Sequence, residues 1–200
     1  MTQRLVLASN NAGKLREFGQ ILAPLGFTLH PQDEFGVPEA EEPFFTFVEN
    51  ALAKARHAAR LTGLPALADD SGVCVNALGG APGVWSARYA GEPKSDARNS
   101  ARLVADLAAH ADKSAYYYCV LVYVRHADDP QPVIADGVWT GTISETARGA
   151  NGFGYDPHFW LAALGKSAAE LTPLEKNTVS HRGQALRALV EKLAKLAPST

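Results

Sequence analysis

The chain has few cysteines, almost no net charge and no long apolar run, and each of these absences excludes a class of protein. Its two cysteines, Cys74 and Cys119, are too few for the disulfide framework of a small secreted domain, and their spacing is not that of metal ligands. A formal charge of −2 provides no general attraction for nucleic acid or an anionic membrane surface. No apolar run approaches membrane-spanning length, and no signal peptide follows Met1. We therefore expect a cytoplasmic protein whose partners include no nucleic acid polymer and no membrane.

The composition and the length are typical of a globular α/β protein. Hydrophobic residues make up 46% of the 200 residues and charged residues 20%, which is enough to bury a substantial core. The expected strands cover residues 4–9, 64–70, 116–125 and 133–146, and the expected helices cover residues 14–22, 46–62, 95–110 and 180–196. We expect a mixed α/β fold in which residues 1–200 form a single domain with two lobes that flank a cleft.

Two capping boxes mark helix starts. Thr46 is followed three residues later by Glu49, and Thr172 by Glu175, with proline at the first helical position of the second helix. We assign Glu49 to capping rather than to catalysis. The acidic, proline-bearing residues 30–43 are expected to form a loop, and residues 149–157 are too rich in glycine for regular structure.

Two adjacent acids, Asp69 and Asp70, close a short apolar run and are followed at once by Ser71 and Gly72. The run is typical of a buried strand, and the residues after it predict that the strand ends at the two acids. Because side chains alternate along a strand, one carboxylate can face a ligand while the other turns away. Two carboxylates at the end of a buried strand need partners or a cation. The pair is therefore a candidate for holding a divalent metal or activating a water.

A second candidate is the turn Ser-Asn-Asn-Ala-Gly-Lys at residues 9–14, between the first strand and the first helix. Backbone N–H groups at a helix N-terminus, together with a lysine, can bind a phosphate. The segment is not a P-loop, because the leading glycine is absent and Leu15 follows Lys14 where a serine or threonine is required. An ordinary capped turn explains these residues at least as well as a phosphate site.

Glu41, Glu42 and Lys54 are further candidates near the acids. Mg²⁺ commonly takes one or two carboxylates, with water and substrate phosphates completing its shell. Glu41 and Glu42 could join the paired aspartates if the fold brings the two segments together; otherwise they belong to a solvated acidic loop. Lys54 lies near the polar edge of its helix with Asn50 and His57. A lysine in that position is usually solvated surface.

The last candidates lie in the second half of the chain. Glycine on both sides of Phe153 allows close backbone approach, and the aromatic rings of residues 153–156 offer a flat face for stacking a base. The alternative is a glycine-rich loop with Phe153 in the core. His181 and Arg182 stand in the first turn of the last helix, where the helix dipole disfavours cations. This placement, with Lys176 nearby in the sequence, favours a site that binds an anion or a carbonyl oxygen.

Taken together, these stretches resemble the inosine triphosphate pyrophosphatase family, whose members hydrolyse deaminated purine nucleoside triphosphates. Five blocks carry the resemblance in the family's order and spacing: LVLASNNAGKLREF, FVENALAKARHAA, ALADDSGVCVNALGGAPGVWSARYAG, GFGYDPHF and SHRGQAL. The match is closest to the bacterial branch, which acts on ITP, dITP and XTP. The resemblance implies an elongated mixed-sheet α/β fold with two lobes around a central cleft, and a homodimer.

The resemblance also implies roles for individual residues. Asp70 would be the general base, and Lys54, the second catalytic residue, would touch the phosphates. Mg²⁺, the implied cofactor, would be held by Glu41, Glu42 and Asp70. The purine nucleoside triphosphate would be bound by Ser9, Asn10, Asn11, Ala12, Gly13, Lys14, Ser71, Phe153, Gly154, Tyr155, Asp156, Lys176, His181 and Arg182. The chain departs from many relatives in having Ser9 and Asn10 where they have Thr-Gly, so Asn10 must accept the backbone angle of a glycine.

The implied reaction is hydrolysis at the α-phosphate of ITP, dITP or XTP, which releases the nucleoside monophosphate and pyrophosphate and cleanses the nucleotide pool. The sequence leaves two other functions open. A nucleotide-binding sensor would keep the glycine loops and the cations but would not need the paired acids near the phosphates. A carboxylate–metal phosphatase would release orthophosphate, but the chain lacks its lone aspartyl nucleophile followed two residues later by an acid.

Overall fold

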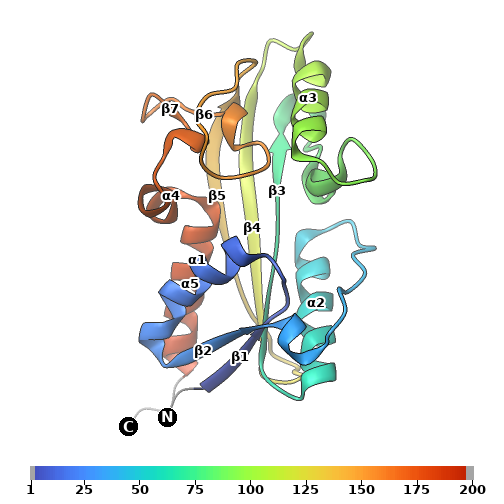
Figure 1. Ribbon diagram of the computed structural model, residues 1–200, viewed down its shortest axis with the longest axis vertical. Coiled ribbons are helices and arrows are strands. Elements are labelled where there is room, and N and C mark those ends of the chain that lie inside the picture. The colour runs from blue at the N-terminus through green and yellow to red at the C-terminus, as the bar shows by residue number, and fades with distance from the viewer. Residues whose placement is uncertain (1–2, 197–200) are drawn as a thin grey trace. The chain divides into compact units, whose positions relative to one another are not determined.

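The computed structural model describes residues 3–196, which contain one seven-stranded sheet and five α-helices (Figure 1). The strands are β1 (Gln3–Leu7), β2 (Phe27–Pro31), β3 (Ala66–Val75), β4 (Ser114–Val124), β5 (Val133–Ile143), β6 (Phe159–Leu161) and β7 (Lys166–Ser167), in the sheet order β2-β1-β3-β4-β5-β6-β7. The helices are α1 (Ala12–Leu22), α2 (Phe47–Thr62), α3 (Asp96–Leu107), α4 (Pro173–Val179) and α5 (His181–Leu196). The predicted mixed α/β class is confirmed. None of the helices in this part of the chain is both long and apolar enough to cross a membrane.

The chain folds into two compact units, each with its own hydrophobic core. Of the described residues, unit 1 holds 3–70, 119–136 and 184–196, and unit 2 holds 71–118 and 137–183. Strands β3, β4 and β5 and helix α5 contribute residues to both units.

In unit 1, β1 lies between β2 and β3 and runs parallel to both. The register pairs Leu7 of β1 with Leu67 of β3, and the N–H of Ala8 donates to the Leu67 carbonyl at 2.8 Å. The turn that follows β1 and the acids that follow Leu67 therefore start at the same level of the sheet. This pairing positions the residues of unit 1 that carry the chemistry.

The core of unit 1 follows the expected periodicity. Phe18 and Leu22 of α1 are four residues apart and fully buried, as are Leu186 and Leu189 of α5, three apart and at most 1% exposed. Strand β2 was not predicted, because its Thr28, His30 and Pro31 interrupt any apolar run. The predicted loop 30–43 also contains regular structure that was not predicted, the short 3₁₀ helix Gln32–Phe35.

Helix α2 begins and ends as predicted, but its buried face differs. The Thr46 hydroxyl accepts the N–H of Glu49 at 3.3 Å, and Gly63 ends the helix with a positive φ of 66°. The sequence predicts Val48 on the buried face, whereas Val48 is exposed and Asn50 is buried. Five of the 16 residues of α2 are alanine. Their small side chains leave the apolar face weakly defined, so a tertiary polar contact can decide which face is buried.

The prediction that a strand ends at Asp69 and Asp70 is wrong. Strand β3 continues through Ser71 to Val75, so the two acids lie in the middle of the strand. Gly72, which indicated a turn, is required for close packing instead. A Cβ atom built on Gly72 would lie 2.2 Å from the carbonyl oxygen of Gly83.

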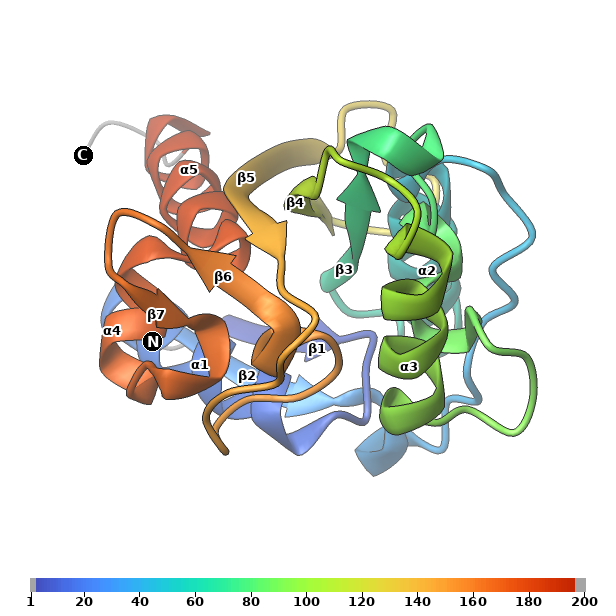
Figure 2. The same ribbon diagram turned by 90° about the horizontal axis from the view of Figure 1, so that it is seen from above.

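Unit 2 packs aromatic side chains between strands and helix α3. The antiparallel pair β6–β7 precedes α4 (Figure 2). Tyr117, Trp139 and Phe159 are buried together in its core, with the ring centroids of Tyr117 and Phe159 4.6 Å apart. Residues 149–157 are irregular up to a short 3₁₀ turn at Asp156–His158, which agrees with their glycine-rich sequence.

Candidate active site

The residues predicted to form the site fall into two groups, one in each unit. Unit 1 carries the turn 9–14, Glu41, Glu42, Lys54, Asp69 and Asp70. Unit 2 carries Ser71, residues 153–156, Lys176, His181 and Arg182. The contacts within each group decide which of these side chains can act on a ligand.

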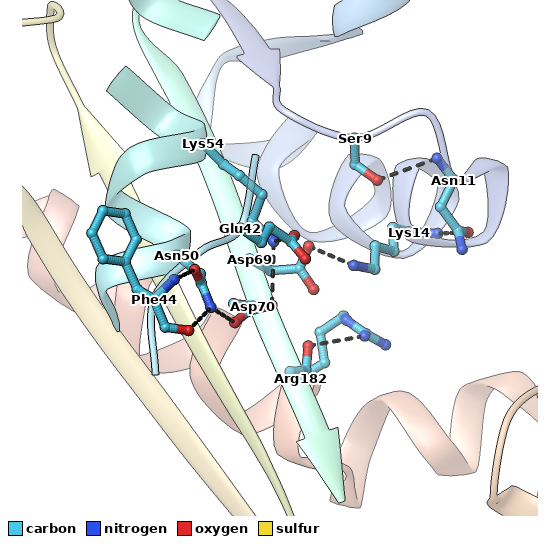
Figure 3. A network of polar contacts seen from close by, with 11 residues as sticks. Ser9, Asn11, Lys14, Glu42, Phe44, Asn50, Lys54, Asp69, Asp70 and Arg182 are labelled. Atoms are coloured by element: carbon cyan, nitrogen blue, oxygen red, sulfur yellow. Dashed lines mark hydrogen bonds and ion pairs between the residues drawn. The ribbon is translucent and has the colours of Figure 1, made fainter. Parts of the chain in front are cut away.

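The turn 9–14 of unit 1 is stabilised by its own side chains (Figure 3). Asn11 is the N-cap of α1, and its Oδ1 accepts the N–H groups of Gly13 at 2.8 Å and Lys14 at 3.1 Å. The Ser9 hydroxyl accepts the N–H of Asn11 at 3.2 Å. Asn10 needs no glycine-like backbone, because no non-glycine residue of the described chain has a positive φ. The capped turn is therefore present, and the ammonium group of Lys14 is its clearest contribution to binding an anion.

Lys14 is held by one of the paired acids. Its Nζ lies 2.8 Å from Oδ1 of Asp69, whose side chain is 1% exposed. Figure 3 shows these two side chains pointing toward one another. The ion pair fixes a cation beside the turn between β1 and α1. Asp69 thus positions Lys14, and this role differs from that of Asp70.

Lys54 lies between two carboxylates. Its Nζ is 2.6 Å from Oε1 of Glu42 and 3.2 Å from Oδ1 of Asp70, and its side chain is only 12% exposed. The alternative that Lys54 is a solvated surface lysine is therefore wrong. Glu42 and Asp70 are 28 residues apart in the sequence, yet their carboxylates contact the same ammonium group. The fold thus brings the two acidic segments together, which a shared Mg²⁺ site requires.

Burial and charge shift the pKa values of this group in a consistent way. Burial raises the pKa of Asp70 to about 6, and the charges of Glu42 and Asp69 add to the rise while Lys54 opposes it. Burial also lowers the pKa of Lys54, but the nearby acids, Asp70 foremost, outweigh it and raise the pKa above its ordinary value. Lys54 is therefore charged at neutral pH, and the carboxylates have an unmet demand for positive charge.

The donor set of unit 1 fits Mg²⁺ bound together with a nucleotide. Within residues 3–196, no three His, Cys, Asp or Glu side chains gather closely enough to hold a metal ion by themselves. Two carboxylates do converge, Glu42 and Asp70, and Mg²⁺ often takes only one or two while phosphate oxygens and waters complete its shell. Glu41, the third expected ligand, is exposed and lies outside the carboxylate pair that shares Lys54.

Unit 2 presents one exposed aromatic ring beside two cations. Phe153 is 46% exposed, so the alternative that it lies in the core is wrong. Nζ of Lys176 lies 4.9 Å from the centre of its ring, and Cζ of Arg182 lies 5.8 Å from it. An accessible flat ring with cationic donors lying over it is suited to an aromatic ligand that carries hydrogen-bond acceptors.

Asp156 holds this ring in place. Its buried carboxylate accepts the N–H of Phe153 at 2.9 Å, forms an ion pair with Lys176 at 2.5 Å and accepts the hydroxyl of Tyr117 at 3.2 Å. The loop approaches this carboxylate so closely that a Cβ on Gly152, whose φ is 77°, would lie 2.1 Å from Oδ2. The carboxylate of Asp156 therefore stabilises the loop conformation and is already engaged by protein groups rather than available to a ligand.

The middle of the 153–156 loop is also anchored. The backbone of Gly154 is held by α3, since its N–H donates to Asp96 at 2.8 Å and its carbonyl accepts the Ser100 hydroxyl at 3.2 Å. The side chain of Tyr155 is buried in the core, with its hydroxyl donating to the Ser86 carbonyl at 2.7 Å. Of the two aromatic residues expected to stack on a base, only Phe153 presents its ring.

His181 and Arg182 occupy the first turn of α5, as predicted. The imidazole of His181 stacks on the ring of Tyr117, with centroids 4.7 Å apart and planes within 6°. Arg182 donates to the hydroxyl of Ser71 at 3.4 Å. Both side chains are buried, so the protein groups packed around them fix their orientation.

Two residues of the site were not predicted. Asn50 contacts Asp70 and the backbone of Phe44, and Tyr117 contacts Asp156 and His181. Asn50 does lie on the polar edge of α2, which was a usable signal. Tyr117 lies within an aromatic stretch that indicates only a buried strand.

Several known proteins resemble this chain over nearly its whole length. The profile of the Ham1 family matches residues 5–192. A "dITP/XTP pyrophosphatase" of Ralstonia nicotianae is 70% identical over 194 residues (96% of each chain), and one of Chromobacterium violaceum is 68% identical over 197 residues, covering 98% of this chain and 100% of that one. The structure of a HAM1 protein from Coxiella burnetii superposes with a TM-score of 0.92 at 49% identity, covering 97% of this chain and 100% of that one. This chain therefore belongs to the Ham1 family.

Proposed function

We propose that the chain is a Mg²⁺-dependent nucleoside triphosphate pyrophosphatase. It hydrolyses deaminated purine nucleoside triphosphates (ITP, dITP and XTP) to the nucleoside monophosphate and pyrophosphate. The observation that carries the proposal is the buried Lys54 between Glu42 and Asp70, a cluster suited to a metal-bound triphosphate. The names of the similar proteins support the substrate class.

The group in unit 1 supplies what the triphosphate needs. Lys14, held by Asp69, and Lys54 provide two fixed positive charges for phosphate oxygens. Glu42 and Asp70 would hold Mg²⁺, which when bound neutralises charge on the triphosphate and lowers the pKa of the attacking water. Hard oxygen donors and fixed ammonium groups together favour a polyphosphate over an uncharged ligand.

Asp70 acts as the general base in this mechanism. Its carboxylate accepts a proton from water as the water oxygen forms a bond to the α-phosphorus. The bond between the α-phosphorus and the oxygen bridging to the β-phosphorus breaks at the same time, and pyrophosphate leaves with that oxygen. Lys54 keeps Asp70 oriented and offsets the negative charge that builds up on the phosphate.

The group in unit 2 supplies what the base needs. Phe153 offers its exposed ring for stacking, and Lys176 and Arg182 stand beside it as donors. Hypoxanthine and xanthine have a 6-oxo acceptor, whereas adenine has a 6-amino donor that these cations repel. A site built for one hydrogen-bond pattern can reject the other by about 10⁴-fold. Guanine also has a 6-oxo group, and its 2-amino group is the natural feature for its exclusion.

The test is a panel of purine triphosphates scored for the inorganic product. We expect pyrophosphate from ITP, dITP and XTP in the presence of Mg²⁺, and little from ATP or GTP. Removal of Mg²⁺ with EDTA should abolish the release. Orthophosphate as the main product would favour a phosphatase, and tight binding without hydrolysis would favour a sensor. Comparable rates on ITP and GTP would contradict the proposed base selectivity.

We further propose that the enzyme is a homodimer and acts in the cytoplasm. Both proposals rest on the family resemblance and on a substrate drawn from the nucleotide pool. Sedimentation equilibrium of the purified chain should give twice the mass of 21.3 kDa. A single species at the monomer mass would contradict the dimer.

A further inference from the structure

We propose that Asn50 is a positioning residue that holds the segment bearing Glu42 in register with the carboxylate of Asp70. The inference deepens the proposed function and rests on it, because it concerns the two carboxylates assigned to Mg²⁺. Asn50 itself touches neither the nucleotide nor the metal in this assignment. It acts through the groups that do.

The side chain of Asn50 makes three polar contacts although it is only 1% exposed. Its Oδ1 accepts the N–H of Phe44 at 3.1 Å, and its Nδ2 donates to the carbonyl of Phe44 at 3.1 Å. The same Nδ2 lies 3.4 Å from Oδ2 of Asp70 (Figure 3). A carboxamide has one acceptor and two N–H donors, so all three contacts can be made at once. Aspartate at this position would keep the acceptor and lose both donors.

The segment that Asn50 holds has no regular structure of its own. Residues 37–44 belong to no helix or strand, so side chains must fix their backbone. One face of α2 does so at three points: Asn50 at Phe44, Lys54 at Glu42, and His57 at the carbonyl of Pro38, 3.1 Å away. Residues 50, 54 and 57 are spaced to share one helical face.

Asn50 differs from Lys54 and His57 because its neutral amide group also contacts the carboxylate of Asp70. Lys54 links Glu42 and Asp70 by its charge, and that charge competes with a metal for the same oxygens. The amide of Asn50 leaves Asp70 negative and leaves Oδ1 of that carboxylate to other partners. Asn50 can therefore hold Asp70 and the segment at Phe44 when a divalent cation occupies the carboxylates.

Helix α3 contains a matched control. Asn99 is the fourth residue of α3, as Asn50 is of α2, and it is also 1% exposed. Its Oδ1 accepts the N–H of Ala90 at 2.7 Å, and its Nδ2 donates to the carbonyl of Ala87 at 3.0 Å. The two asparagines thus make the same kind of clamp on a preceding segment. Among the contacts described for them, only Asn50 adds a carboxylate of the candidate site.

The experiment compares Asn50→Ala with Asn99→Ala in the full-length chain. Hydrogen exchange of the segment containing the Phe44 amide measures the clamp without any need for activity. Initial rates of pyrophosphate release from dITP are then measured over a range of Mg²⁺ concentrations. We expect faster exchange at Phe44, and a half-saturating Mg²⁺ concentration raised about 10- to 100-fold, the usual effect of losing a group that orients a metal ligand. The KM for dITP at saturating Mg²⁺ should change by less than about threefold, a margin well below that effect.

Asn99→Ala should lower the melting temperature by a similar amount but leave the exchange at Phe44 and the Mg²⁺ dependence as in the wild type. Equal effects of both substitutions on Mg²⁺ dependence would overturn the proposal, since a general loss of stability would then explain them. Wild-type exchange and Mg²⁺ dependence in Asn50→Ala would also overturn it.

A second variant covers the case in which Asn50→Ala does not fold. Asn50→Asp has the same size and keeps an acceptor for the Phe44 N–H, so the amide should stay protected while kcat falls at least ~10-fold. Wild-type kcat in Asn50→Asp would overturn the proposal. If the wild-type chain releases no pyrophosphate from any of the deaminated substrates, the proposed function itself fails. Normal wild-type release with unaffected Asn50 variants would refute the positioning role alone.

Discussion

Asp69 and Asp70 are consecutive residues of β3, yet their carboxylates are held by different lysines. Asp69 Oδ1 lies 2.8 Å from Nζ of Lys14 in α1, whereas Asp70 Oδ1 lies 3.2 Å from Nζ of Lys54 in α2. Alternation of side chains along a strand separates the two acids in this way. They are therefore not interchangeable: Asp69 positions a cation, and Asp70 shares one with Glu42.

Replacement of Asp70 tests the assigned base. Asp70→Asn removes the proton acceptor and one anionic metal ligand while it keeps the size of the side chain. We expect kcat for dITP to fall by at least ~10², the lower end for general acid–base catalysis. Steady-state kinetics on a variant with native circular dichroism measure the effect. Near wild-type kcat would rule out Asp70 as the base.

Replacement of Lys54 tests the demand of Glu42 and Asp70 for a cation. Lys54→Met leaves two carboxylates facing one another in a mostly buried site, and breaking such a pair costs about 3–5 kcal/mol. In EDTA we expect the melting temperature to fall well below that of the wild type. Mg²⁺ should recover part of the loss, because binding to the folded state alone stabilises it.

The control for this experiment is Lys113→Met. Lys113 pairs with Glu145 at 3.5 Å and has no part in the site. Its replacement should leave the stabilisation by Mg²⁺ equal to that of the wild type. If Mg²⁺ stabilises Lys54→Met no more than it stabilises Lys113→Met, the loss of Lys54 does not increase the demand of Glu42 and Asp70 for a cation, and this prediction is wrong.

The features that could be predicted from the sequence are those decided over a few residues. The helix start at Thr172 and Glu175 is correct, since both halves of its capping box are present. The same local reasoning ended β3 at Asp70, because Ser71-Gly72 indicates a turn in isolation. The close approach of the Gly83 carbonyl, 11 residues further along, is the true reason for the glycine.

Features decided by tertiary contacts could not be predicted in this way. Lys14 and Asp69 are 55 residues apart, and their pairing depends on the parallel register of β1 and β3. Asn50 meets Asp70 across 20 residues for a similar reason. Tyr117 could not be predicted, because it is one of several aromatic residues in a buried strand. The sequence does not show which of them contacts residues of the site and which only packs in the core.

The stability of unit 1 should depend on pH through Asp129. Hydrogen bonds from the side chain of Arg125, with further N–H donors from Arg125 and Gln131, hold the pKa of Asp129 well below its usual value. Because the folded pKa is below the unfolded one, the stabilisation is complete above pH ~4 and is lost as the pH falls further. Urea unfolding at pH 7 and pH 3 should show a larger difference in the wild type than in Asp129→Asn. Equal differences would show that another acid dominates.

Replacement of Phe153 tests the stacking surface of unit 2. Stacking of a base on an aromatic ring contributes roughly 1–3 kcal/mol, so Phe153→Leu should raise the KM for dITP by about 5- to 150-fold. Phe153→Trp should stay within about threefold of the wild type because it keeps a flat ring. Phe45, whose side chain is 83% exposed in unit 1, provides a control. An equal rise in KM in Phe45→Leu would refute a specific role for Phe153.

Tyr117 contacts both Asp156 and His181 in unit 2, and substitution by phenylalanine removes its hydroxyl alone. Tyr117→Phe keeps the ring stacked on His181 but removes the hydrogen bond to Asp156. A hydrogen bond to a charged acceptor contributes about 1.5 kcal/mol, so we expect roughly a 10-fold rise in the KM for dITP with little change in kcat. Tyr123→Phe, which alters a buried tyrosine of unit 1, should leave KM unchanged. If Tyr117→Phe also leaves KM unchanged while Phe153→Leu raises it, Lys176 and the Phe153 N–H are sufficient to hold Asp156.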